Sequence, residues 1–508
     1  MSKKNSKTLF PILDSQLFHW GNLPSDRSDI VYLMVEDRDL IASHRFHKHR
    51  IIHRLAAMRS HARSLRGAGL CLQYVSLVKA LPDESYLQRL DRIVEEGEYD
   101  AIEHFEIEDR ALESGIARLA RRRGLRLTVL DSPMFLCTRG AFAKWIQNRS
   151  RLRMADFYKQ QRRELGILVN ERGKPLGGRW SFDQNNRQSL PGHVPLAALP
   201  EVEPKKLLQD VCKVVSKNFP NHPGSVDGFW FPYTSSGAKR WLEDFLEQRF
   251  TRFGDYQDAI ARRSDTTFHS VLAPLLNCGL LTPDQVVRRA LEFAEAQQIE
   301  LNNTEGFVRQ IIGWREFVRG IHTHYGDIQE KRNFWNHSRG LTPDWYSGTT
   351  GIEPLDDVIR KANRIGYAHH IERLMVVGNL MTLCEIQPRT AHDWFMEMFV
   401  DSDSWVMGPN VYGMALHSDG GLFATKPYIC GSNYLLKMSD YQRGEWCTTI
   451  DALLWRFVGR HRSYFRSQPR LSMMARRYET FDSSRRDRIE STARAFLDNK
   501  TVRREQAA

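Results

Sequence analysis

The sequence contains no stretch of about 18 consecutive apolar residues, the length that a membrane-spanning helix requires. Its first residues, MSKKNSKTLFPILDSQ, include lysines but no sustained apolar segment of the kind found in signal peptides. The 7 cysteines stand singly and form no CxxC pair, which argues against a disulfide framework or a zinc module. These absences predict a soluble cytoplasmic protein with no membrane partner.

Several common catalytic signatures are also missing. The sequence has no P-loop, no GxGxxG after its first expected strand, no HExxH and no GxSxG. Nucleotide hydrolysis, the usual dinucleotide binding, metalloprotease activity and serine-hydrolase activity therefore have little support. The five histidines of one expected helix are spread around it, which favours a solvated basic face over a metal site; they are His44, His47, His49, His53 and His61.

Basic residues exceed acidic ones by a modest margin. The 508 residues include 73 Lys and Arg against 61 Asp and Glu, which gives a formal net charge of +12. Such a balance suits a polyanionic partner without proving one. Arginines between Arg456 and Arg477 occur with no acidic residue among them, so they could follow backbone phosphates; a solvated arginine face is the alternative.

Strand-like and helix-like patterns alternate over residues 1–135. Expected strands cover 30–35, 70–77, 101–105 and 125–130, and expected helices end near Gly67 and Gly124. This alternation predicts an α/β domain with a parallel, Rossmann-like sheet. Residues 136–200 are rich in Gly, Pro and Asn and predict an interdomain connection, whereas 201–508 predict an all-helical domain.

One helical tract, GFVRQIIGWREFVRGIHTHY at 306–325, sets Gln310 and Trp314 on one face. A tryptophan offers a stacking surface and a glutamine offers edge hydrogen bonds, so the pair could line a cavity for a flat polar ring. On this tract alone, a plain core role for Trp314 is equally acceptable.

Eight blocks together, in this order, resemble the cryptochrome/photolyase family, and most closely its bacterial iron-sulfur subgroup, which includes (6-4) photolyases. The resemblance covers nearly the whole chain, and its specificity comes from the set of blocks since no single block would be diagnostic. The blocks are MADFYKQQRRELGILVN, GGRWSFDQNNR, RFTRFGDYQDAI, HSVLAPLLNCGLL, EGFVRQIIGWREFVRGI, GYAHHIERLMVVGN, PNVYGMALHSDGG and KPYICGSNYLLKMSDY.

The resemblance implies FAD bound inside the helical domain. Residues that match cofactor-binding positions or lie near them are Tyr256, His269, Ser270, Arg315, Asn379, Asp401, Asp403 and Asn410. A carboxylate beside the flavin ring can accept a hydrogen bond from its N3–H, the role that we expect for Asp401. For Asp403, capping a helix or turn is the alternative.

The resemblance also implies lesion chemistry over the flavin, at Gln310, Trp314, His369, His370 and Tyr428. In (6-4) repair, reduced FAD donates an electron to a flipped-out photoproduct and an imidazolium supplies a proton. Cyclobutane-dimer enzymes typically have Asn at the position of His370, so His370 indicates a (6-4) photolyase, with His370 as proton donor. Leu374 stands where animal (6-4) enzymes have a second histidine. Two adjacent histidines on an apolar helix are otherwise often core residues.

The chain departs from the subgroup at its [4Fe-4S] cluster, which needs four cysteine thiolates. Pro354 and Gln442 stand where cysteines are expected, and only Cys447 remains. We therefore predict no iron-sulfur cluster, with packing by Trp446 and Leu453 in its place.

The antenna position also differs, because Leu40 replaces the subgroup's glutamate. Glu36, Asp37 and Asp39 are near enough to substitute, so a 6,7-dimethyl-8-ribityllumazine antenna stays open. For photoreduction, Trp394 matches a relay position, and Tyr346 replaces a tryptophan with Trp345 beside it; a purely structural Trp394 is the alternative.

Three hypotheses follow. The first is a monomeric, nucleoid-associated (6-4) photolyase that binds UV-damaged DNA through Arg179, Arg187, Arg460, Arg462 and Arg466. The second is a cryptochrome-like blue-light receptor that binds FAD without repair, and the third is a basic DNA-binding protein with a vestigial flavin pocket. The set Gln310, Trp314, His370 and Tyr428 favours repair, because a sensor needs no proton donor over the flavin.

Overall fold

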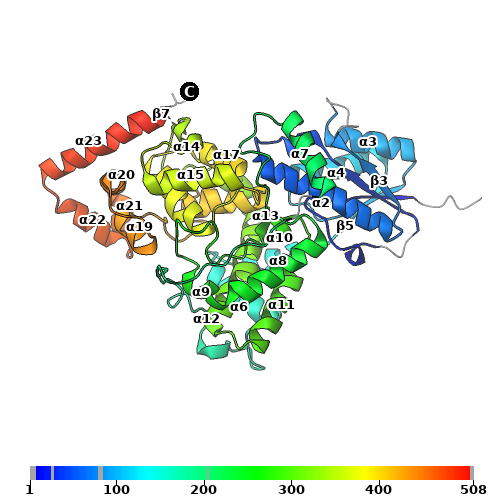
Figure 1. The fold of residues 1–508 in the computed structure, drawn as a ribbon, viewed down its shortest axis with the longest axis horizontal. Coiled ribbons are helices and arrows are strands. Elements are labelled where there is room, and N and C mark those ends of the chain that lie inside the picture. The colour runs from blue at the N-terminus through cyan, green and yellow to red at the C-terminus, as the bar shows by residue number, and fades with distance from the viewer. Residues whose placement is uncertain (1–6, 25–27, 78–83, 203–204, 504–508) are drawn as a thin grey trace, which may run out of the picture.

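The computed structural model describes residues 7–24, 28–77, 84–202 and 205–503. A five-stranded parallel sheet occupies the N-terminal part, at the right of Figure 1, with strand order β3-β2-β1-β4-β5. Its strands are β1 (Thr8–Pro11), β2 (Ile30–Val35), β3 (Leu72–Val75), β4 (Ala101–Phe105) and β5 (Arg126–Leu130). The helices and short turns of this part are η1 (Trp20–Asn22), α1 (Arg38–Ile41), α2 (Lys48–Gly67), α3 (Tyr86–Gly97) and α4 (Arg110–Arg123).

Successive strand residues point to opposite faces of the sheet, and each face has its own core. Phe10, Tyr32 and Met34 pack with the apolar residues of α2, in a core that continues into the helical part. Leu9 and Leu33 face the other way and pack with the apolar side of α3 and α4. Both faces are covered over the central strands β1 and β2, which are almost entirely apolar, as in other parallel sheets. Strand β4 includes the buried Glu103 and His104, and the edge strand β5 is partly exposed.

The predicted α/β class is confirmed, and so are the strands at 30–35 and 101–105. The central strand β1 and helix α3 were not predicted. The helix expected to end at Gly124 does so, since Gly124 takes the left-handed backbone conformation (φ 67°) that closes a helix.

The predicted solvated histidine face on α2 is wrong. His47, His49 and His53 are buried, and their Nε2 atoms donate to the carbonyl oxygens of Asn363, Asp227 and Pro232 at 2.9–3.0 Å. These acceptors lie far along the chain, so α2 forms the contact between the sheet and the helical part.

Residues 136–200 contain α5 (Arg139–Ile146), α6 (Met154–Glu164) and η3 (Leu176–Gly178) in otherwise irregular chain. Helices dominate from residue 205 onward. The first group is α7 (Lys206–Asn218), α8 (Ser235–Gln248), η4 (Phe250–Arg252), α9 (Phe253–Tyr256), α10 (Ala273–Asn277), α11 (Pro283–Ala296), α12 (Leu301–Val308), η5 (Arg309–Arg315) and α13 (Glu316–Lys331). The second is α14 (Asp344–Ser347), α15 (Glu353–Ile365), η6 (Glu372–Gly378), α16 (Asn379–Leu383), α17 (Pro388–Met398), α18 (Ser404–Gly408) and η7 (Pro409–Ala415).

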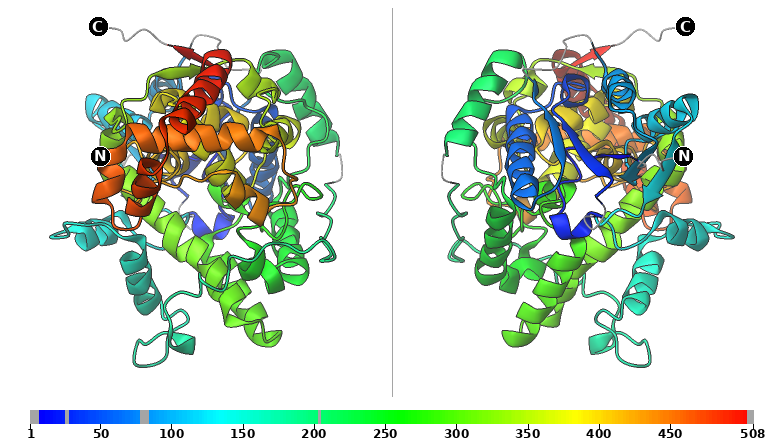
Figure 2. Two further views of the ribbon diagram at one scale, coloured as in Figure 1. Left: turned by 90° about the vertical axis from the view of Figure 1, so that its left-hand side faces the viewer. Right: turned by 90° about the vertical axis from the view of Figure 1, so that its right-hand side faces the viewer.

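The last helices lie at the far end of the long axis from the sheet, at the left of Figure 1. They are α19 (Ser432–Met438), α20 (Glu445–Arg460), α21 (Arg462–Ser467), α22 (Ser472–Glu479) and α23 (Ser483–Lys500). Figure 2 shows α23 on the outside of this end. The strand β7 (Thr501–Arg503) after α23 pairs antiparallel with β6 (Arg339–Leu341), which fixes the end of the described chain to the helical core.

Three helical segments, η5, η6 and η7, have the wider π-helical turn. Such turns are rare and often occur at functional sites, because the extra residue displaces side chains from the ordinary helical spacing. No helix of the described residues is long and apolar enough to cross a membrane.

Candidate functional site

A cavity of about 420 Å³ lies inside the helical part. All three π-helical segments contribute to its wall: η5 provides Gln310, Trp314 and Arg315, η6 provides Arg373 and Leu374, and η7 provides Asn410 and Met414. Apolar side chains form most of the remaining lining. A mainly apolar cavity with a few converging polar groups is the usual form of a cofactor site.

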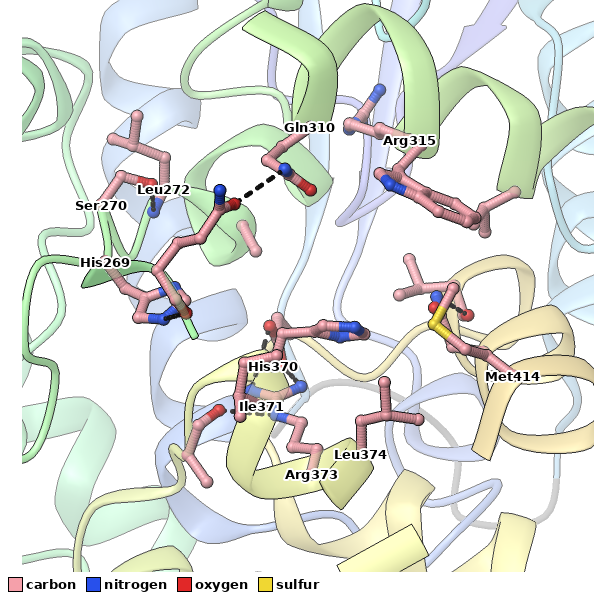
Figure 3. Close-up of a pocket in the computed structure, with 18 of the residues that line it drawn as sticks. His269, Ser270, Leu272, Gln310, Arg315, His370, Ile371, Arg373, Leu374 and Met414 are labelled. Atoms are coloured by element: carbon pink, nitrogen blue, oxygen red, sulfur yellow. Dashed lines mark hydrogen bonds and ion pairs between the residues drawn. The ribbon is translucent and has the colours of Figure 1, made fainter. Parts of the chain in front are cut away.

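His370 projects into this cavity. Figure 3 shows its ring in the space between Gln310 and Arg315 on one side and Leu374 and Met414 on the other. His370 is exposed to the open cavity, yet the protein that surrounds it disfavours the charged form by desolvation and, with the positive charge of Arg373, lowers the pKa of His370 to about 4. The lowered pKa favours the neutral imidazole in the free protein.

A chain of hydrogen bonds fixes the polar edge of the cavity opposite His370. Gln310 donates from Nε2 to Gln257 Oε1 at 3.2 Å and to the carbonyl of Gly306 at 3.0 Å, so its amide has a defined orientation. The backbone carbonyl of Gln257 in turn accepts a hydrogen bond from His269 Nε2 at 3.0 Å. Ser270 lines the same wall as His269.

His369 does not reach the cavity. Its ring is buried and stacks on His269, with centroids 4.6 Å apart and planes 10° apart. Burial lowers the pKa of His369 well below its ordinary value, and the positive charge of Lys361 lowers it further. The structure thus separates the two adjacent histidines: His370 faces the cavity, whereas His369 supports the wall behind it.

Arg373 and Asp401 form an ion pair in the cavity wall. The guanidinium meets both carboxylate oxygens, at 2.8 and 3.2 Å, and also donates from Nε to the carbonyl of Ala368 at 2.6 Å. Asp401 was predicted from the sequence, whereas Arg373 was not. Asp401 lies 28 residues from Arg373 along the chain, so no local sequence pattern predicts the pair.

Arg315 is the most unusual cation of the lining. It donates from Nη1 to the carbonyl of Met134 at 2.6 Å, but its Nε and Nη2 atoms are buried and have no hydrogen-bond partner. Burial lowers the pKa of Arg315 to about 10. The carboxylate of Glu316 lies 3.9 Å away and the rings of Phe135 and Trp405 lie within 5 Å of the guanidinium carbon, so the charge itself is compensated. The two N–H groups left without an acceptor among the described residues still cost free energy unless an oxygen occupies the neighbouring space.

Three predicted cofactor residues lie outside the cavity lining. Asn379 uses its amide on the backbone of Cys430, accepting at 3.0 Å and donating at 3.2 Å. Tyr256 packs on Phe268, with ring centroids 5.3 Å apart. Asp403 instead pairs with Arg50 and Arg54 of α2, at 3.1 and 2.8 Å, and so joins the helical part to the α/β part.

Tyr428 and Arg187 line the cavity beside a group of charged residues. Arg187 pairs with Asp183 at 2.6 Å and lies 3.9 Å from Asp258, whose pKa is raised to about 6 by burial and by Asp183. The half-buried Lys426 has a lowered pKa, because burial and the nearby charges of Arg470 and Arg187 disfavour its protonated form. We call Arg187, Lys426 and Arg470 the basic rim. Arg470 belongs to the arginine tract predicted to follow backbone phosphates, whereas Lys426 was not predicted.

The other predicted DNA-binding arginines differ in their surroundings. Arg179 and Arg462 are exposed. Arg460 pairs with Glu385 and Arg466 pairs with Glu479, although both side chains keep more than half of their surface exposed. Arg456, at the start of the same arginine tract, is buried between Glu385 and Glu490, which gives it a structural role.

The predicted electron-transfer residues lie behind the cavity wall. Trp394 is fully buried in α17 and donates from Nε1 to the carbonyl of Trp345 at 2.8 Å. Its ring lies 5.4 Å from that of Phe395, which lines the cavity. Tyr346 is half-buried on α14, next to Trp345.

Side chains at the expected cluster and antenna positions are engaged otherwise. Cys447, Trp446 and Leu453 are buried in the apolar core. Glu36 accepts from Arg59, Tyr74 and the backbone of Leu77, and Asp37 caps α1 and pairs with Arg89, so neither carboxylate is free for a ligand. Asp39 is exposed.

Comparisons with known proteins agree with this architecture. Residues 10–231 match the family model described as deoxyribodipyrimidine photo-lyase-related protein, and residues 307–428 match the FAD binding domain of DNA photolyase. The second match contains η5, η6 and η7, and therefore the segments that enclose the cavity.

The chain is 33% identical over 461 residues to a (6-4) photolyase of Agrobacterium fabrum, covering 89% of this chain and 91% of that one. The fold matches crystal structures of a class III photolyase from Agrobacterium tumefaciens (19% identity, 98% and 99% coverage) and of a Synechocystis cryptochrome (14%, 98% and 100%), each with a TM-score of 0.58. With this similarity along nearly its whole length, the chain belongs to the photolyase/cryptochrome family.

Proposed function

We propose that this protein is a (6-4) photolyase, which repairs pyrimidine (6-4) photoproducts in UV-damaged DNA with light and reduced FAD. The observation that carries the proposal is His370, projecting into the cavity between Gln310 and Leu374 in a chain similar throughout to a (6-4) photolyase. The same cavity places Trp314 and Tyr428 in its lining, where they could stack against or orient a flipped-out base.

The donor groups of the cavity suit FAD. The unpartnered Nε and Nη2 atoms of Arg315 would be satisfied by an anionic or carbonyl oxygen of the cofactor, while His269, Ser270 and Asn410 supply further polar contacts. When bound, reduced FAD supplies the light-driven electron that the reaction needs. Asp401, already held by Arg373, has a fixed position from which to accept a hydrogen bond.

In this proposal His370 supplies the proton at its imidazole nitrogen, and Gln310 orients the lesion. His369 is a positioning residue, because it contacts His269 and does not line the cavity. Gln257 lines the cavity and also holds the amide of Gln310 in place. The neutral state of His370 in the free protein means that the imidazolium must form when DNA binds. Backbone phosphates raise the pKa of a nearby imidazole, so bound DNA favours that step.

The experiment compares illuminated, FAD-reduced protein with two oligonucleotides, one carrying a (6-4) photoproduct and one a cyclobutane dimer. We expect repair of the first alone. Repair of the dimer alone would contradict the lesion assignment, and flavin binding without repair of either would favour the light-receptor hypothesis.

We also propose that no iron-sulfur cluster is present, since of the four positions expected for cysteine only Cys447 has one. About four iron atoms per chain by elemental analysis would contradict this.

The basic rim is the proposed entry for the damaged strand. Arg470→Ala should weaken DNA binding and reduce the slope of log K against log salt by about 0.9, because one phosphate contact is lost. Arg122→Ala on α4 removes an exposed arginine, paired with Asp91, from the α/β part and should leave both quantities unchanged. Fluorescence anisotropy at several salt concentrations measures both; an equal loss in the two variants would exclude a specific role for Arg470.

Trp394 is the proposed relay for reducing the flavin. Trp394→Phe keeps an aromatic ring in the buried site but removes the easily oxidised indole, so photoreduction should fall to a small fraction of its wild-type rate. Repair by protein that is reduced chemically beforehand should persist. The absorbance of oxidised flavin under blue light is the measurement, and an unchanged rate would leave Trp394 with a structural role only.

A further inference from the structure

A second cluster of ligand-type side chains lies outside the cavity, between the two parts of the molecule. His44 belongs to the loop between α1 and α2, and His392 and Asp393 belong to α17. Within the described residues, this is the one group of three or more His, Cys, Asp or Glu side chains whose ligand atoms all lie within 4.8 Å of one another.

The distances in this cluster are close to those of a metal site. Asp393 Oδ1 lies 3.9 Å from His44 Nε2 and 3.7 Å from His392 Nδ1. Zinc bonds of about 2.0–2.1 Å place two tetrahedral ligand atoms roughly 3.3 Å apart, so Asp393 Oδ1 would have to approach each histidine nitrogen by about 0.4–0.6 Å. The two histidine nitrogens lie within 4.8 Å of each other. Both separations from Asp393 Oδ1 are too long for hydrogen bonds, so these contacts do not satisfy the groups.

The cluster also holds buried polar atoms without partners. His392 is 6% exposed, and within the described residues its Nδ1 atom has no hydrogen-bond partner, like Nδ1 of His44. Asp393 Oδ1 is also buried, with Arg389 Nε 3.1 Å away. A buried imidazole nitrogen left without a partner costs free energy, which a bound cation would recover. The Asp393 side chain is 40% exposed, so an ion can enter from solvent and keep water in its remaining coordination positions.

One cation competes for the carboxylate. Arg389 Nε lies 3.1 Å from Asp393 Oδ1, one turn earlier on α17. Its side chain is 56% exposed and can turn into solvent when an ion binds. Arg389 should therefore weaken metal binding without preventing it, and removing its charge should strengthen binding.

We propose that His44, His392 and Asp393 bind a zinc-class divalent metal ion that joins the loop before α2 to α17. Two imidazoles and one carboxylate are a ligand set that suits such ions. The ring of His392 stacks on Tyr412 of η7 at 4.9 Å and 6°, and Trp394 follows Asp393 directly. The ion would thus fix α17 between the α/β part and a segment that lines the cavity.

The test uses the full chain, loaded with FAD, free of any histidine tag and kept in the dark. Isothermal titration with Zn²⁺ should show one ion bound per chain. Co²⁺ should give visible d–d absorption in difference spectra at wavelengths longer than the oxidised flavin bands. Asp393→Asn and His44→Ala should each weaken binding at least tenfold, and Arg389→Gln should strengthen it several-fold. His193→Ala, which removes an exposed histidine elsewhere, should change nothing.

A stability measurement checks the same proposal independently. Zn²⁺ should raise the thermal midpoint of the wild type and of His193→Ala but not that of Asp393→Asn, because an ion stabilises only a folded state that binds it. His392→Phe keeps the ring stack on Tyr412 and should also abolish the shift. The absence of stoichiometric binding, or binding that is equal in wild type, His44→Ala and Asp393→Asn, would overturn the proposal.

Discussion

His370→Ala should reduce the yield of (6-4) repair at least 100-fold while leaving the flavin spectrum and the affinity for damaged DNA unchanged. The imidazole projects into the cavity and is the proposed proton donor. A positioned general acid typically contributes about 10²- to 10⁴-fold to a rate, so its loss should affect the chemical step and not binding. Illumination of pre-reduced protein with a (6-4) oligonucleotide, followed by product analysis, measures the yield.

The matched control is His193→Ala, which removes an exposed histidine and should repair at the wild-type rate. A second comparison is His369→Asn, at the buried position behind His269. Since His369 does not line the cavity, this variant should retain more repair than His370→Ala. Substantial residual repair in His370→Ala would assign the proton to another group.

Asp403→Ala should destabilise the protein by about 3–5 kcal/mol, the usual cost of leaving buried charges without their partner. Asp403 accepts from both Arg50 and Arg54, whose side chains are 9% and 2% exposed. The two guanidinium groups belong to α2, so the substitution should weaken the contact between the α/β part and the helical part. Chemical denaturation of the FAD-loaded protein measures the change.

An exposed ion pair gives the control for this prediction. Glu96 pairs with Arg92 on α3 with both side chains largely in solvent, and Glu96→Ala should cost less than about 1 kcal/mol. If Asp403→Ala were as mild as Glu96→Ala, the ion pair with α2 would not be a main fixed point between the two parts.

The α/β class was predictable from the sequence because the strand at 30–35 is uniformly apolar, the strand at 101–105 is mainly apolar, and helices that follow them end at Gly67 and Gly124. The strand β1 was missed because TLFP is short and ends in proline, features that its central position in the sheet overrides. The helix expected to include His44 begins only at Lys48, since nothing local shows that His47 caps it.

The cavity residues were predictable where one segment carries them, as for Gln310 and Trp314, or where the resemblance supplied them, as for His370. The roles of the Asp401 and Asp403 carboxylates depend on arginines that lie far from them along the chain. Asp401 pairs with Arg373 in the cavity wall, whereas Asp403, two residues on, pairs with arginines about 350 residues earlier. Neither the π-helical turns nor the separation of His369 from His370 follows from local periodicity.

The pH profile of repair by pre-reduced protein tests the proton-donor role most directly. The pKa of His370 lies below neutrality, so only its protonated fraction can donate, and that fraction falls as pH rises. We predict that the wild-type yield falls steadily between about pH 6 and pH 9 at constant DNA occupancy, and that the residual yield of His370→Ala does not follow this trend. A wild-type yield that stays constant over this range, or a variant with the same profile as the wild type, would contradict the account.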